Sequence, residues 1–257
     1  MNKKRSRQFF FLFVTVVFLI AFWGQSRAVQ AETSDPFSLP HALSPDPIYR
    51  MTTHRSNEKI VYLTFDDGPS PMTEQLLDLL DRFHAKATFF MLQPSILKYP
   101  QSVRRMRDEG FALGLHGVSH NFRKLYRSKK SVIQEMTTAQ KALQQVAQVQ
   151  ARFIRTPYGS SPFMKLKYRK AMVEQGFIMW DWNIDSQDWR LQNWRFNTRT
   201  IQKVQQLEKQ KETPVILLHD MPTTVRAIEP LLKYLHDRHY EMRAITPSMH
   251  PLQFRLQ

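Results

Sequence analysis

Short apolar segments alternate with amphipathic helical segments along most of this chain, and that alternation restricts its fold more than any other feature. The apolar segments are rich in β-branched and aromatic residues and end at turns, which is typical of buried strands. We predict strands at residues 59–65, 87–92, 111–115, 152–155, 177–182, 215–218 and 243–246. We predict helices from Thr73 to about residue 83 and at 95–109, 132–146, 163–175, 198–209 and 225–238. This repetition predicts an α/β fold with a parallel sheet, either closed into a barrel or open and doubly wound.

The composition fits one large α/β domain with appendages and excludes several kinds of site. At 257 residues, with 42% hydrophobic residues, the chain can bury a large core. It contains no cysteine, which excludes disulfides, thiolate zinc sites and cysteine nucleophiles. Any metal must therefore be bound by histidine and carboxylate side chains.

The N-terminus has the pattern of an export signal. Basic residues precede an apolar run at residues 9–23, and small residues follow, with a cleavage site predicted after Ala31. The run is shorter than the ~20 apolar residues of a spanning helix, which favours a cleaved signal peptide over a retained membrane anchor, although both remain open. Either form places the working domain outside the cytoplasm, secreted or held on the outer face of the membrane. We predict that 1–31 is this segment, 32–56 a linker, 57–246 the functional domain and 247–257 a C-terminal tail.

The chain is strongly basic. Its formal net charge is +15, and +10 remains when the five basic residues of the first 31 are set aside. This excess favours a polyanionic setting such as a cell wall, a membrane surface or nucleic acid, although much of it can equally be solvated surface. No nucleic-acid module is visible, so we expect no nucleic-acid partner, and we expect membrane contact only through the N-terminal segment.

Candidate catalytic residues follow the predicted strands. Asp66 and Asp67 end the first strand, and two adjacent carboxylates need a positive partner, for which a divalent metal is the natural candidate. His116 and His120 follow another strand at a spacing that lets them share one ion. His219 ends a third strand. In a parallel α/β sheet these strand ends meet at one edge, where active sites lie.

Two further stretches carry candidate residues, each with an ordinary alternative. Arg155 begins the turn Arg-Thr-Pro-Tyr-Gly, which could expose backbone N–H groups to an oxyanion or could be a simple surface loop. Residues 182–189 are crowded with tryptophan and aspartate. Aromatic side chains can line a sugar-binding groove, but tryptophans are equally common in cores.

Taken together, these stretches resemble the carbohydrate esterase family 4, the NodB-like polysaccharide deacetylases. The resemblance covers about residues 58–246, and its motif Thr-Phe-Asp-Asp-Gly-Pro is intact at 64–69. It implies a distorted (β/α) barrel of about seven parallel strands and a polysaccharide deacetylase catalytic domain. The first aspartate of that motif, Asp66, is then the general base.

The resemblance also implies a metal site. Asp67, His116 and His120 correspond to the family's ligands, for zinc most simply, with cobalt or another transition metal as alternatives. Gly117 stands where the family has a serine or threonine that braces the ligand loop, which removes no ligand and leaves open whether metal binding is weakened.

The remaining roles follow in the same way. Arg155 steadies the base, and the Tyr158 backbone N–H binds the oxyanion. Leu217 lines the acetyl pocket, and His219 is the general acid. In the stretch 182–189 we assign Asp185 as the carboxylate that tunes this acid and Trp189 as a groove wall, with Asp181 and Asp188 as weaker candidates for the carboxylate.

The implied activity is metal-dependent hydrolysis of N-acetyl groups from an extracellular polysaccharide, and we expect the N-acetylglucosamine of peptidoglycan. Chitin oligosaccharides and acetylated xylan are alternative substrates. A glycoside hydrolase is disfavoured, because adjacent carboxylates do not by themselves give the spacing of ~5 Å or more used across a glycosidic bond. A non-catalytic wall-binding protein on the same fold is the other alternative.

Overall fold

The computed structural model describes residues 59–191 and 193–255. The predicted export segment and linker lie outside the described residues. The strands are β1 (Lys59–Asp66), β2 (Ala87–Leu92), β3 (Ala112–Gly117), β4 (Phe153–Ile154), β5 (Ile178–Met179), β6 (Ile184–Asp185), β7 (Val215–His219) and β8 (Tyr240–Met242). The helices are α1 (Thr73–Arg82), α2 (Gln93–Lys98), α3 (Pro100–Asp108), α4 (Phe122–Leu125), α5 (Lys129–Ala147), α6 (Leu166–Glu174), α7 (Asp188–Leu191), α8 (Arg195–Gln210), α9 (Pro222–Ala227) and α10 (Glu229–Asp237). No helix among the described residues has both the length and the apolar character that crossing a membrane requires.

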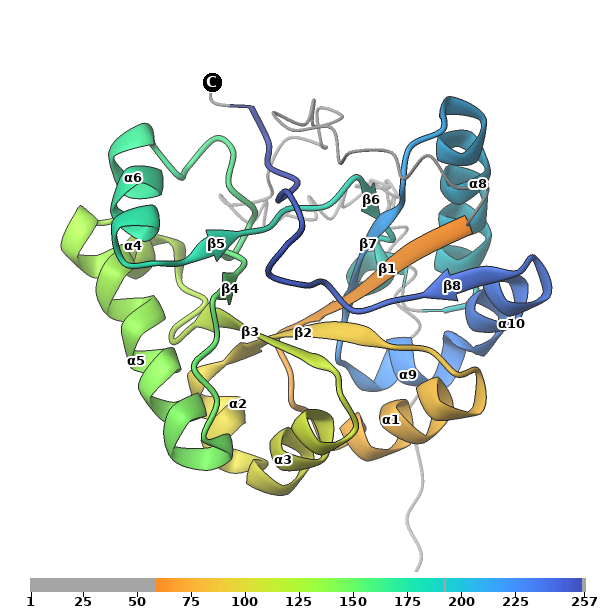
Figure 1. Ribbon diagram of the computed structural model, residues 1–257, viewed down its shortest axis with the longest axis horizontal. Helices are drawn as coiled ribbons and strands as arrows, with labels where there is room; N and C mark the ends of the chain where they lie inside the picture. The colour runs from red at the N-terminus through yellow and green to blue at the C-terminus, as the bar shows by residue number, and fades with distance from the viewer. Residues whose placement is uncertain (1–58, 192, 256–257) are drawn as a thin grey trace, which may run out of the picture. The chain divides into compact units, whose positions relative to one another are not determined.

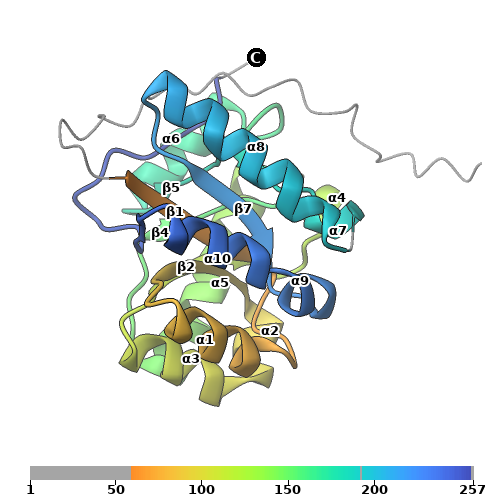
Figure 2. The same ribbon diagram turned by 90° about the vertical axis from the view of Figure 1, so that its right-hand side faces the viewer.

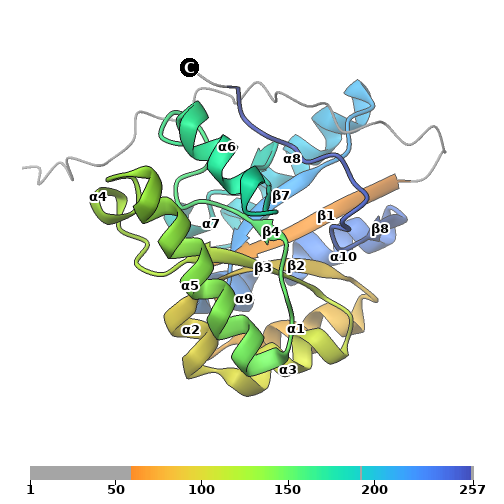
Figure 3. The ribbon, with the colours of Figure 1, turned by 60° about the vertical axis from the view of Figure 1, so that its left-hand side comes forward.

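The strands form one curled parallel sheet in the order β5-β4-β3-β2-β1-β7-β6, with β8 beside the start of β1 (Figure 1). The strands β5 and β6 are consecutive in sequence yet lie at opposite ends of this order, so the barrel is open between them. Helices α8, α9 and α10 cover the side of the sheet formed by β1 and β7 (Figure 2), and α5 runs beside β3 (Figure 3). The predicted distorted barrel of about seven parallel strands is confirmed.

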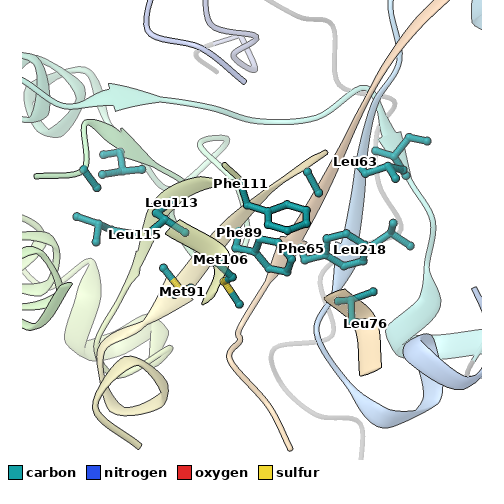
Figure 4. Packing of buried hydrophobic residues seen from close by; sticks show 14 of the residues in the cluster. Leu63, Phe65, Leu76, Phe89, Met91, Met106, Phe111, Leu113, Leu115 and Leu218 are labelled. Atoms are coloured by element: carbon teal, nitrogen blue, oxygen red, sulfur yellow. The ribbon is translucent and has the colours of Figure 1, made fainter. Parts of the chain in front are cut away.

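Alternation along β1 assigns each of its side chains to one of two environments. Val61, Leu63 and Phe65 belong to the large cluster between sheet and helices, where Phe65 stacks on Phe89 at 5.3 Å between ring centroids (Figure 4). The intervening residues point the other way, into the barrel. There Ile60 and Tyr62 join a small apolar cluster, while the last inward residues of the strand are polar. Inside the barrel, β1 thus contributes apolar side chains at its start and polar side chains at its end, where the candidate site lies.

Several element boundaries differ from the sequence predictions. The helix predicted at 95–109 is two helices, α2 and α3, because Pro100 lacks an N–H and restricts the backbone before it. The helix predicted at 225–238 is likewise divided into α9 and α10. The last strand lies at Tyr240–Met242, before the predicted 243–246, where Tyr240 and Met242 are buried in the large cluster and the strand pairs with the start of β1.

The C-terminal segment, predicted as a tail at 247–257, packs against the domain. Leu252 and Phe254 are buried. The Asp181 N–H donates to the Leu252 carbonyl at 2.8 Å, and the Phe254 N–H donates to Asp181 Oδ2 at 2.7 Å. Arg169 Nη1 donates to the Phe254 carbonyl at 2.8 Å. The chain end is therefore bonded to the residues that follow β5 and to α6.

Candidate active site

Two adjacent carboxylates at the end of β1 face different environments. Asp66 is the last residue of the strand and is buried, in register with His219 at the end of β7. Asp67 follows with a φ of 72°, which turns its side chain away from the strand direction. The Asp220 N–H donates to the Asp66 carbonyl at 2.9 Å and so ties the two strand ends together. The register of β1 and β7 therefore places Asp66 and His219 side by side at this edge of the sheet.

Asp67, His116 and His120 form a cluster that could bind a metal ion. One ligand atom from each lies within 4.8 Å of the others. Asp67 Oδ1 is 3.5 Å from His116 Nε2 and 3.6 Å from His120 Nε2, and it is buried without a hydrogen-bond partner. A buried carboxylate oxygen without a donor costs free energy that a cation would recover. Two imidazoles and a carboxylate are also the donor set of many catalytic zinc sites, so these residues fit a divalent metal.

The protein fixes the protonation of His116. Its Nδ1 lies 2.8 Å from the Arg155 carbonyl, which only accepts hydrogen bonds, so Nδ1 carries the proton and Nε2 keeps its lone pair toward Asp67. Burial lowers the pKa of His116 to about 3, and its ring is therefore neutral. A neutral imidazole with an oriented lone pair is the form that binds a metal.

Arg155 is hydrogen-bonded to Asp66, a contact that its predicted role of steadying the base requires. The guanidinium is fully buried, and its Nη1 donates to Asp66 Oδ1 at 2.9 Å and to Thr64 Oγ1 at 2.7 Å. Its other nitrogens donate to the carbonyls of Trp180 and Asp181. Burial raises the pKa of Asp66 despite the opposing charge of Arg155, which makes this carboxylate a stronger base than an exposed one.

Asp188, rather than the predicted Asp185, is the carboxylate that contacts His219. His219 Nδ1–H donates to Asp188 Oδ1 at 2.8 Å, and the His219 backbone N–H donates to Asp188 Oδ2 at 2.7 Å. Asp188 also accepts from the Trp189 N–H and from Thr224 Oγ1, so both carboxylate oxygens have two donors. Asp185 instead accepts from the Gln187 N–H, which closes a local turn.

This pair favours the protonated form of His219. Burial by itself lowers the pKa of His219, but the hydrogen bond and charge of Asp188, together with the charges of Asp66 and Asp67, outweigh it and raise the pKa to about 9. The ring can therefore carry a proton at neutral pH. A protonated imidazole near Asp66 and the predicted ligands is placed to act as an acid.

The other predicted site residues lie around this centre. The ring of Tyr158 is 5.0 Å from that of His120, and its hydroxyl donates to the His120 carbonyl at 3.0 Å. Leu217 is buried on β7, in register with Asp185 on β6. Trp189 is 48% exposed, as a groove wall requires. The roles of Tyr158, Leu217 and Trp189 stay predictions.

Glu135, which the sequence analysis missed, braces the loop that carries the two histidines. Its Oε2 accepts from the Val118 N–H at 2.6 Å and the Ser119 N–H at 2.8 Å, and its Oε1 accepts from Ser119 Oγ at 2.6 Å. Gly117 has a φ of +91°, and a Cβ there would lie 3.1 Å from Glu135 Oε2. The loop lacking the usual hydroxyl is thus held by a carboxylate from α5. The sequence contains one indication of this contact. Glu135 lies three residues after Val132, so it is next to the apolar face of the helix, which packs on the domain.

Asp220 was also missed, and it fixes the turn after Asp67. Its carboxylate accepts from Ser70 Oγ at 2.7 Å and Thr73 Oγ1 at 2.5 Å. A Cβ on Gly68 would lie 2.5 Å from Asp220 Oδ2, which explains why this turn needs glycine. The turn after Asp67 is therefore held by the carboxylate of Asp220, which lies 150 residues after Ser70 in the sequence.

Comparisons with known proteins point to one family. The family model described as polysaccharide deacetylase matches residues 53–179. A putative polysaccharide deacetylase of Bacillus subtilis, YheN, is 40% identical over 81% of this chain and 76% of its own length. A Bacillus cereus protein named peptidoglycan-N-acetylglucosamine deacetylase is 38% identical over 76% of this chain and 73% of its own.

Solved structures show the same likeness. The crystal structure of a polysaccharide deacetylase from Bacillus cereus matches with a TM-score of 0.67 and 37% identity, covering 77% of this chain and 97% of that one. The peptidoglycan deacetylase PdaC from Bacillus subtilis matches with a TM-score of 0.63 and 30% identity, covering 74% of this chain and 89% of that one.

Proposed function

This chain belongs to the polysaccharide deacetylase family, and on that premise we propose that it hydrolyses the N-acetyl groups of N-acetylglucosamine in peptidoglycan, releasing acetate outside the cytoplasm. The observation that carries the proposal is the meeting of three features at one sheet edge: the buried carboxylate of Asp66, a cluster of three residues that could bind a metal, and a histidine hydrogen-bonded to Asp188. The name of the Bacillus cereus relative and the basic charge of this chain support peptidoglycan as the substrate.

Asp67, His116 and His120 would hold the metal, for which we expect zinc, with cobalt or another transition metal also suited to this donor set. Such a cation, when bound, polarises the acetyl carbonyl and lowers the pKa of water. His116 is presented in the correct tautomer by the Arg155 carbonyl, so Arg155 serves both the base and a ligand.

The protein's own groups supply the proton transfers. Asp66 takes a proton from water as the water oxygen attacks the acetyl carbon. Arg155 keeps the Asp66 carboxylate oriented during this transfer. The Tyr158 backbone N–H would stabilise the oxyanion of the tetrahedral intermediate. His219, held by Asp188, donates its proton to the sugar nitrogen as the carbon–nitrogen bond breaks. Acetate and a glucosamine unit are the products.

Acetate release tests this proposal directly. We expect the purified protein to release acetate from peptidoglycan, to stop after treatment with a chelator, and to recover when zinc or cobalt is added. Chitin oligomers and acetylated xylan, assayed in parallel, rank the alternative substrates. A folded, metal-loaded protein that binds these glycans but releases no acetate would contradict the proposal and favour the wall-binding alternative.

The Glu135 brace gives a separate prediction about metal affinity. Because Glu135 holds two backbone N–H groups and one hydroxyl of the ligand loop, Glu135→Ala should weaken zinc binding by about 10- to 100-fold. Glu135→Gln keeps an acceptor oxygen and should lose less. Gln134→Ala, at an exposed position of the same helix, is the matched control. Competition with a chromophoric chelator measures the affinity without any turnover, and equal affinities for all four proteins would show that the brace does not matter.

A further inference from the structure

A cavity of about 550 Å³ lies beside the active-site loops and is lined by residues of α4 and of the segment that leads into α6. Its aromatic walls are Phe122, Tyr126, Phe163 and Tyr168. Phe122 meets Phe163 edge-on at 4.5 Å between ring centroids and lies 5.4 Å from Tyr126. Rings held by one another in this way form a rigid surface against which a sugar ring can pack.

This cavity is coupled to the catalytic loops by direct contacts. The Tyr126 hydroxyl lies 2.8 Å from the Pro157 carbonyl and 3.3 Å from the Gly159 carbonyl, on either side of Tyr158. The Phe122 ring lies 6.2 Å from the Tyr158 ring, which in turn lies beside His120. A polymer whose reacting sugar occupies the catalytic centre therefore has this cavity within reach of a neighbouring unit.

The cavity is also strongly basic. Arg123, Arg127 and Lys165 line it, all three are exposed, and no acidic residue is among its lining. Residues 121–130 contain five basic and no acidic residues, and residues 160–173 contain four basic and none acidic. Two such segments facing one another produce a positive potential that attracts anions.

We propose that this cavity binds the carboxylate-bearing substituent of the sugar next to the one that is deacetylated. The inference rests on the proposed function, because peptidoglycan alternates N-acetylglucosamine with a sugar that carries a lactyl group and an acidic peptide. The aromatic walls contact the sugar and the peptide backbone, and the guanidinium groups pair with the carboxylates, for which their planar donor geometry is suited. The cavity thus distinguishes an acidic glycan from a neutral one.

The test is a charge reversal measured on two substrates of equal length. We expect the double variant Arg127→Glu/Lys165→Glu to lower kcat/KM on muropeptide oligomers roughly tenfold, mainly through KM, while kcat/KM on neutral chitin oligomers stays within about twofold. Amidation of the muropeptide carboxylates should remove the difference between the variant and the parent protein. Lys209→Glu is the control, because Lys209 is exposed on α8, which contacts β6 at the end of the strand order opposite to β5 and α6. It should leave kcat/KM unchanged on both substrates.

Two results would overturn the inference: an equal loss on both substrates, which indicates general damage to the site, and unchanged kinetics on the muropeptides. Binding of the muropeptides by calorimetry, with the same variants, gives an answer that does not depend on turnover. Binding by the parent protein that the double variant loses, with no acetate released by either, would sink the proposed function and keep this inference.

Discussion

Asp66→Asn is expected to reduce acetate release by about 10²- to 10⁴-fold, because an amide cannot accept the proton of the attacking water. The substitution preserves the shape of the side chain. In the parent protein Arg155 Nη1 donates to Asp66 Oδ1 at 2.9 Å, and an asparagine oxygen can accept the same hydrogen bond. The loss should therefore appear in kcat, measured at saturating substrate.

The metal site gives the control for this variant. Asp66 is not one of the three clustered ligands, so the zinc affinity of Asp66→Asn should stay close to that of the parent protein. Unaltered thermal unfolding would show that the fold tolerates the neutral amide beside the buried Arg155. Normal acetate release by a folded, zinc-loaded Asp66→Asn protein would remove Asp66 from the role of base.

Asp188→Asn is expected to lower kcat roughly 10²-fold and to move the alkaline limb of the pH profile to lower pH. Both oxygens of Asp188 accept from two donors, so an amide NH₂ in either place faces an N–H of His219. The carboxylate also contributes to raising the pKa of His219 to about 9. The acid form exists below that pKa, so a lower pKa removes it at a lower pH.

Profiles of kcat/KM against pH for both proteins provide the measurement. Asp185→Asn is the matched control, because Asp185 lies in the same stretch but bonds to the Gln187 N–H instead of to His219. An alkaline limb that moves in Asp185→Asn and stays fixed in Asp188→Asn would reverse the assignment.

The local sequence predicted those parts of the fold and site that depend on neighbouring residues. Alternation along β1, and the turn that follows it, placed Asp66 and Asp67 at a strand end, where parallel pairing brings His219 into register. The spacing of His116 and His120 predicted their proximity to one another. The register of one parallel sheet then placed both pairs at one edge.

Contacts between distant segments could not be predicted in this way. Asp181, Asp185 and Asp188 lie within eight residues, and only the packing of α7 against β7 and α9 decides which of them meets His219 and Thr224. The Glu135 brace likewise depends on how α5 packs beside β3. A sequence with three similar carboxylates in one stretch provides candidates, and tertiary packing chooses between them.

Residues 252–254, which follow all the catalytic side chains in the sequence, are hydrogen-bonded to Asp181. Asp181 also offers its carbonyl to Arg155 Nη2 at 3.0 Å, and Arg155 in turn orients Asp66. The base is thus connected through two side chains to a segment near residue 254. The orientation of the base therefore depends on a segment that comes after every catalytic side chain in the sequence. A substitution near residue 254 can thus act on the catalytic centre without contacting it.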